Sequence, residues 1–138
     1  MRYILTFILI IFFSGCSKNS KPDENHITKE NNLTIQKSIN KDNVTIIHFD
    51  NFVLKFKNNE LVYPENKTVI LFDNNNSYSK AQEMVLKKLN IKYYKTNAPY
   101  LEKYFNINNY PTIVVLDKNK TVKYENFTPY EILKAEGF

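Results

Sequence analysis

The chain has 138 residues, with 19 Lys or Arg against 14 Asp or Glu, which gives a formal net charge of +5. That length suits one domain. The single cysteine excludes an internal disulfide, a cysteine-based zinc site and a two-cysteine redox centre. The two histidines exclude a multi-histidine metal site, and the two glycines exclude a glycine-rich phosphate loop. Lysines alternate with acids and form no basic stripe, so the sequence predicts neither a cofactor nor a nucleic-acid partner.

A short apolar run, Tyr3–Phe13, follows the basic start of the chain. It is too short to span a bilayer, which takes about 20 residues, but it has the length of the apolar core of a secretory signal. Two small residues and then Cys16 come next, and this arrangement resembles a bacterial lipoprotein signal. The resemblance implies that residues 1–15 are a signal peptide and that Cys16 carries the lipid. The alternative is a short uncleaved anchor with an incidental cysteine.

The segment after the apolar run is polar and is expected to be a tether. A lipid on Cys16 would hold the exported protein on a bacterial membrane, facing the periplasm or at the cell surface, and the non-acidic Ser17 favours the outer membrane. Residues 16–43 contain few apolar side chains to offset the entropy of ordering them. They are therefore expected to be flexible, with a short helix over residues 34–40 as an alternative.

Residues 44–138 have the alternating pattern of a folded domain. Apolar runs rich in β-branched residues predict strands, and apolar residues at helical spacing predict helices. The strands are expected at residues 44–49, 52–57, 60–63, 67–72, 91–95, 112–116 and 121–125, and the helices at 77–90, 99–105 and 129–136. Ser77 and Asn97 are expected to cap the first two helices, since both residue types are common helix caps.

The order of these elements indicates the fold class. A strand, a helix and a second strand in sequence predict a right-handed parallel crossover. The tight turn between the last two strands makes that pair antiparallel. The expected fold class is therefore α/β, with a mixed sheet that is flanked by helices on both faces.

Two segments of this domain resemble the thioredoxin fold. LEKYFNINNYPTIVVLDKNKTV, at residues 101–122, has that family's order of a short helix, a loop, an aromatic residue before Pro-Thr, an apolar strand, a turn and a final strand. Upstream, VLKFKNNELVYPENKTVILF resembles the hairpin and first core strand of membrane-tethered extracytoplasmic thioredoxins. The resemblance implies a thioredoxin-like domain over residues 44–138 with an N-terminal β-hairpin extension. It also implies that Tyr110, Pro111 and Thr112 form the cis-proline loop.

The family's redox motif is missing. Its chemistry depends on a Cys-x-x-Cys motif between the first core strand and the following helix, where the helix N-terminus lowers the thiol pKa. Here that junction reads FDNNNSYSKAQEMVLKKL. One alignment places Ser77 and Lys80 at the cysteine positions, and a second places Asn76 and Ser79 there, with Tyr78 inside either motif. Neither alignment contains sulfur, so dithiol exchange is excluded and the domain is expected not to be an enzyme.

A binding role is the leading functional expectation. In active relatives, the residue before the cis proline lines the substrate groove and pairs with an extended peptide, so Tyr110 is a candidate for binding a protein or peptide. The expected function is a lipid-anchored protein-binding or accessory module in the bacterial envelope. One alternative is a component of thiol–disulfide exchange or cytochrome maturation that acts with a cysteine-bearing partner. The others are a structural envelope lipoprotein and a purely structural Tyr-Pro turn.

Overall fold

The computed structural model describes residues 26–30, 33–39 and 43–138. Cys16, the predicted signal peptide at residues 1–15 and the first part of the predicted tether lie outside the described residues. The described elements are β1 (His26–Glu30), β2 (Leu33–Ile39), β3 (Val44–Phe49), β4 (Phe52–Lys57), β5 (Glu60–Val62), β6 (Thr68–Phe72), α1 (Ser77–Lys88), β7 (Tyr93–Thr96), α2 (Pro99–Tyr104), β8 (Thr112–Asp117), β9 (Lys120–Glu125) and α3 (Tyr130–Ala135).

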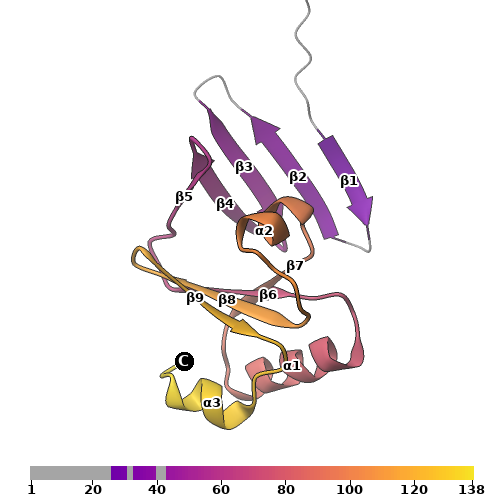
Figure 1. Ribbon diagram of the computed structural model, residues 1–138, viewed down its shortest axis with the longest axis vertical. Coiled ribbons are helices and arrows are strands. Elements are labelled where there is room, and N and C mark those ends of the chain that lie inside the picture. Colours follow the sequence, from indigo (N-terminus) through magenta and orange to yellow (C-terminus); the bar gives the residue numbers. More distant parts are fainter. Residues whose placement is uncertain (1–25, 31–32, 40–42) are drawn as a thin grey trace, which may run out of the picture.

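The strands form two sheets (Figure 1). The first sheet is antiparallel, with its strands in the chain order β1-β2-β3-β4-β5. The second is mixed and has the order β7-β6-β8-β9, in which β6 and β7 are parallel while β8 runs antiparallel to both β6 and β9. This result confirms the α/β class with three helices among the described residues.

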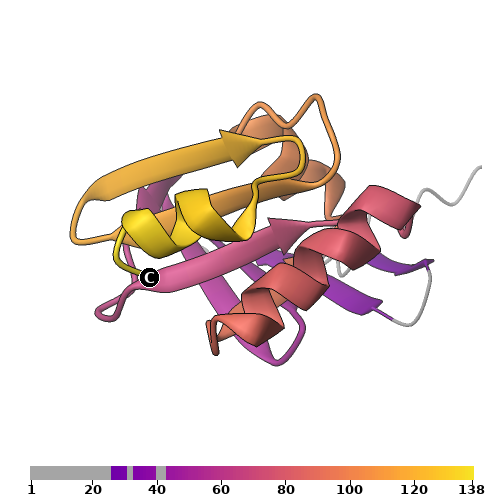
Figure 2. The same ribbon diagram turned by 90° about the horizontal axis from the view of Figure 1, so that it is seen from below.

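The central strand β6 is buried along its whole length because both faces of the mixed sheet are covered. Ile70 and Phe72 point into one core with β3, β4, β8 and α2. Val69 and Leu71, at the alternate positions, point into a second core with α1, α3 and the other side of β8. Figure 2 shows α1 and α3 lying along the same face of the mixed sheet. A continuous apolar run is the pattern that such a doubly covered strand requires.

The structure adds two features to the expected architecture. The strands of residues 44–62 pair with one another in a second sheet, and this sheet and α2 cover the same face of the mixed sheet. Within the segment expected to be a tether, β1 and β2 occupy residues 26–30 and 33–39, and β2 includes residues 34–39 of the stretch considered as a helix. Isoleucines and threonines in this polar segment favour extended backbone, and the edge of β3 offers β2 a partner.

Asparagine ends α1 in the role that glycine usually has. Asn90 follows the last helical turn with φ of +54°. Its N–H donates to the Lys87 carbonyl at 3.0 Å, and the N–H of Ile91 donates to the Leu86 carbonyl at 3.0 Å. These two bonds define a Schellman motif, which satisfies carbonyls that the helix leaves unpaired. The chain has only two glycines, so asparagine takes most of its left-handed positions.

Candidate functional site

Three loops meet at the carboxyl end of β6. Phe72, the last residue of that strand, is paired with Thr96 on one side and with Thr112 on the other. The loops that follow Phe72, follow Thr96 and precede Thr112 are therefore neighbours at one edge of the mixed sheet. The crossover helices α1 and α2 leave β6 and β7 toward opposite faces of that sheet. In α/β proteins, the crevice at such a point is the usual place for a ligand.

The first loop joins β6 to α1 and contains the positions of the missing redox motif. The side-chain oxygen of Asn76 accepts the N–H of Ser79 at 2.7 Å, and its main-chain carbonyl accepts the N–H of Lys80 at 3.1 Å. Asn76 is therefore the helix cap, and the prediction that Ser77 caps the helix is wrong by one residue. Either residue type can cap, but the first helical turn closes on Asn76.

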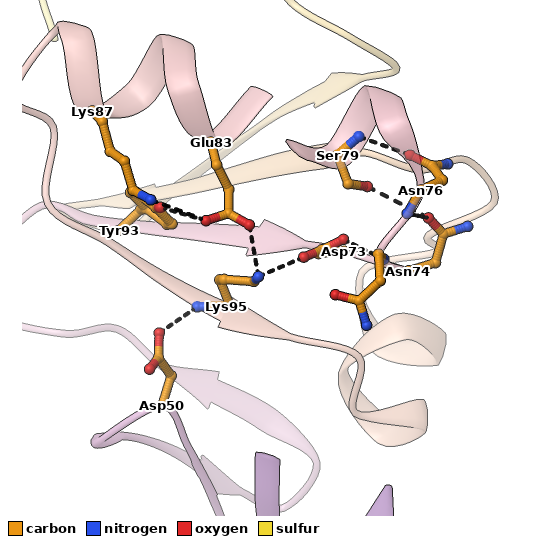
Figure 3. A network of polar contacts seen from close by, with 10 residues as sticks. Asp50, Asp73, Asn74, Asn76, Ser79, Glu83, Lys87, Tyr93 and Lys95 are labelled. Atoms are coloured by element: carbon orange, nitrogen blue, oxygen red, sulfur yellow. Dashed lines mark hydrogen bonds and ion pairs between the residues drawn. The ribbon is translucent and has the colours of Figure 1, made fainter. Parts of the chain in front are cut away.

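The buried serine of this junction, Ser79, has Asn74 and the carboxylate of Asp73 beside its hydroxyl. Ser79 is fully buried, and its hydroxyl donates to the side-chain oxygen of Asn74 at 3.4 Å (Figure 3). A carboxamide does not accept a proton at neutral pH, so it cannot make Ser79 a nucleophile. Ser77, Tyr78 and Lys80 are exposed, and 65% of Tyr78 is accessible. Both alignments of the motif therefore place polar groups at this junction, of which Ser79 is buried and Ser77, Tyr78 and Lys80 are exposed.

A charged network supports this loop from β7 and α1 (Figure 3). The ammonium of Lys95 lies 2.7 Å from an oxygen of Asp73 and 2.7 Å from an oxygen of Glu83. The second oxygen of Asp73 accepts the N–H of Asn75 at 2.5 Å. The main-chain N–H of Lys95 donates to Asp50, in the β3–β4 turn, at 2.8 Å. One lysine therefore connects the loop to α1 and to the antiparallel sheet.

The pKa values in this network are displaced away from neutrality. Burial raises the pKa of Asp73, but hydrogen bonds from Lys95 and Asn75, with the lysine charge, outweigh it and leave the pKa below its ordinary value. The pKa of Glu83 is also below its ordinary value. Burial raises it, but hydrogen bonds from Lys95 and Tyr93, with the lysine charge, outweigh that effect. Burial and the bond to Glu83 raise the pKa of Tyr93 to about 12. Asp73 and Glu83 therefore keep their negative charge at pH 7, where both pair with Lys95.

The third loop contains the predicted binding residues Tyr110, Pro111 and Thr112. The Tyr110–Pro111 peptide bond is cis. The Tyr110 hydroxyl donates to the Glu102 carboxylate of α2, and burial together with this carboxylate raises the pKa of Tyr110 to about 12. Thr112 is fully buried, and its hydroxyl donates to the Asn109 carbonyl at 2.7 Å. The loop is therefore held by its own side chains, and the Tyr110 hydroxyl already has an acceptor.

The second loop, between β7 and α2, begins with Asn97. The prediction that Asn97 caps α2 is wrong, because Ala98 occupies the cap position and no side chain caps the helix. The side-chain oxygen of Asn97 is buried and has no hydrogen-bond partner among the described residues.

The three loops share an unusual composition. Residues 74–79, 97–101 and 105–111, which cover most of these loops and the first turns of α1 and α2, contain no Asp, Glu, Lys or Arg, although 24% of the chain is charged. Carboxamides and tyrosines are common there, and the exposed carboxamides include Asn74, Asn75, Asn108 and Asn109. The charged groups beside them are Asp73, which is paired with Lys95, and Lys123, whose ammonium lies 3.0 Å from the Asn106 carbonyl.

No protein-family model and no curated protein matches the chain. Within residues 43–138 and the two short strands before them, no group of three or more potential metal ligands is found. No helix in the described part of the chain is long and apolar enough to span a membrane.

Sequence reasoning missed the network around Lys95. The available signal was the parallel pairing of β6 with β7, which aligns Leu71 with Lys95 and so brings Lys95 close to Asp73. An acid just after one parallel strand and a lysine near the end of its neighbour are candidates for an ion pair once that register is known.

Proposed function

We propose that this protein is a lipid-anchored, extracytoplasmic thioredoxin-like domain without redox cysteines, which binds an extended segment of another polypeptide at the loops around β6. The order of strands and helices from β6 to α3 supports the thioredoxin-like assignment, because it is the order that the sequence resemblance implies. The placement of Thr112 beside Phe72 supports it further, since the Tyr-Pro-Thr loop then adjoins the start of α1.

The carboxamide-rich composition of the three loops is the observation that carries the binding proposal. The main chain of an extended peptide presents alternating N–H and C=O groups, which carboxamides can pair with as donors and acceptors. The exposed ring of Tyr78 adds apolar area beside them. Because the exposed side chains of these loops are mostly carboxamides, we expect them to favour the polypeptide backbone over an ionic ligand.

Site-specific photo-crosslinking tests this proposal in the producing bacterium. A benzophenone amino acid is placed in the full chain at Asn75, Tyr78 or Asn109, and matched controls carry it at Asn58 and Lys118, in turns away from the loops. We expect one discrete crosslinked protein from the loop positions and none from the controls. Equal crosslinking at all five positions, or none at the loops, would refute binding at this site.

A charge placed in the loops supplies the second arm of the experiment. Asn109→Asp should abolish crosslinking from Tyr78, because the loops would then carry an unpaired carboxylate. Asn58→Asp, at another exposed asparagine, should leave it intact. A crosslinked partner with a Cys-x-x-Cys motif would identify a thiol–disulfide pathway, and the absence of any partner would favour a structural lipoprotein.

The anchor is tested separately. Cys16→Ser should abolish labelling by a radioactive fatty acid and release the protein from the membrane fraction. A Cys16→Ser variant that still takes up the label, or an unmodified chain that takes up none, would refute the proposed lipid attachment, whatever the outcome at the loops.

A further inference from the structure

The exposed side of α1 has a composition unlike the rest of the surface. Six residues of the helix are exposed: Ser77, Tyr78, Lys80, Met84, Lys87 and Lys88. None is acidic: the helix's one acid, Glu83, is half-buried and contacts Lys95 and Tyr93, and it also lies 3.5 Å from the ammonium of the exposed Lys87. Met84 is 71% exposed and Tyr78 is 65% exposed, which makes them the most exposed of the large apolar side chains described.

α3 continues this surface on the same face of the mixed sheet (Figure 2). The ammonium groups of Lys88 and Lys134 lie 4.7 and 5.7 Å from the centre of the Tyr130 ring, one from each helix. Ile132 of α3 is 49% exposed. Two exposed acids lie here as well: Glu131 in α3 and Glu136, which follows the helix as its C-cap.

We infer that this α1–α3 face binds the surface of a bilayer that contains anionic lipids, as a second membrane contact besides the proposed acyl anchor. Lysines around exposed apolar side chains are the pattern of an interfacial helix, in which the apolar groups enter the headgroup boundary while ammonium groups pair with phosphates. Here Met84 and Ile132 would enter that boundary, and Lys80, Lys87, Lys88 and Lys134 would meet the phosphates.

The proposed anchor would keep this face within reach of the membrane. If Cys16 is lipidated, nine residues separate it from His26, so the connection spans at most about 35 Å. A domain of this size has a radius of gyration of about 13 Å and a diameter near 35 Å. Figure 1 shows β1 at the opposite end of the molecule from α1 and α3, so the connection would have to be nearly extended when the α1–α3 face meets the bilayer. This estimate of reach rests on the proposed lipid anchor. The contact between the α1–α3 face and the bilayer can be tested on a chain that carries no lipid.

Vesicle sedimentation of the non-lipidated chain from Ser17 to Phe138, which holds every described residue, tests the contact. We expect binding to phosphatidylcholine vesicles with about one-third phosphatidylglycerol, no binding to pure phosphatidylcholine, and weakening with salt. Each lysine near an anionic surface strengthens binding about five-fold. Replacing Lys80, Lys87, Lys88 and Lys134 together by Gln should therefore weaken it by about 100-fold or more. The matched control removes the same charge elsewhere by replacing Lys55, Lys57, Lys118 and Lys120.

Tryptophan fluorescence locates the contact, because the chain has no tryptophan of its own. Met84→Trp should show blue-shifted emission with anionic vesicles, and Val53→Trp, on the antiparallel sheet, should not. The inference would be overturned if the α1–α3 variant and the control variant, each with four lysines replaced, lost binding equally. It would also be overturned if the unmodified chain did not bind vesicles. Binding to polyglutamate but not to vesicles would also overturn it and indicate an acidic protein partner. Circular dichroism confirms that each variant is folded.

Discussion

Lys95→Met is the sharpest test of how the loop at the end of β6 is held. Its ammonium lies between Asp73 and Glu83, and the Asp73 side chain is only 3% exposed while that of Lys95 is 28% exposed. Removing one partner of a buried ion pair costs about 3–5 kcal/mol, because the other charge is left without compensation. Water reaches Lys95 in part, so we expect about 3 kcal/mol, which is a large share of a small domain's stability.

The dependence of that loss on pH distinguishes an uncompensated charge from lost packing. In the unmodified protein, the pKa of Asp73 lies below its ordinary value of 3.8, so its contribution is present above about pH 4 and is lost as pH falls through the folded-state pKa. Without Lys95, its hydrogen bond and its charge no longer lower the pKa of Asp73, so we expect this pKa to rise. The variant's folded state then binds a proton more readily than the unmodified folded state, and its deficit shrinks as pH falls.

Urea unfolding followed by circular dichroism at pH 7, 5 and 3 measures this deficit. We expect it to be greatest at pH 7 and small at pH 3. Adding Asp73→Asn to Lys95→Met removes the unpaired carboxylate and should recover about 1–2 kcal/mol at pH 7. A deficit below about 1 kcal/mol at pH 7, or one that does not change with pH, would refute the electrostatic account.

Three further changes test the local structure by the same urea titration. Gln82→Leu should cost about 2–4 kcal/mol, because the buried Gln82 amide pairs with both the N–H and the C=O of Thr128, and Gln82→Glu should recover only part of it. Asn90→Gly should stabilise by about 0.5–1 kcal/mol, since glycine adopts its positive φ without strain, whereas Asn90→Ala should destabilise. Asn76→Ala should cost about 1 kcal/mol and Ser77→Ala less than about 0.5 kcal/mol; the reverse ranking would show that the helix cap is misassigned.

The parts of the fold that follow from local pattern were predictable. The run at residues 67–72 is apolar without alternation, and it forms the strand that is covered on both faces. The positions of α1 and α2 follow from helical spacing and from Pro99 at the first helical position. These features depend on residues close in sequence, so a single chain is enough to read them.

The parts that depend on distant pairing were not predictable. Nothing in residues 44–62 indicates whether they extend the mixed sheet or form a second one, because both arrangements bury Ile47 and Phe56. The strand β2 has too few apolar side chains to predict a strand on its own, and its backbone pairing with β3 completes it. The site shows the same limit, since Lys95 reaches Asp73 only through the parallel register of β6 and β7.

The structure also shows how the junction between β6 and α1 is held without cysteines. In a dithiol protein, the start of the first core helix changes covalently when the disulfide forms or breaks. Here the same junction is fixed by the Asn76 cap and by Asp73, whose carboxylate bonds to Lys95 and Asn75. None of these bonds involves sulfur, so thiol reagents do not alter them. If the loops bind a polypeptide as proposed, they will do so equally under oxidising and reducing conditions, which suits a module whose role is to hold a partner and not to exchange electrons with it.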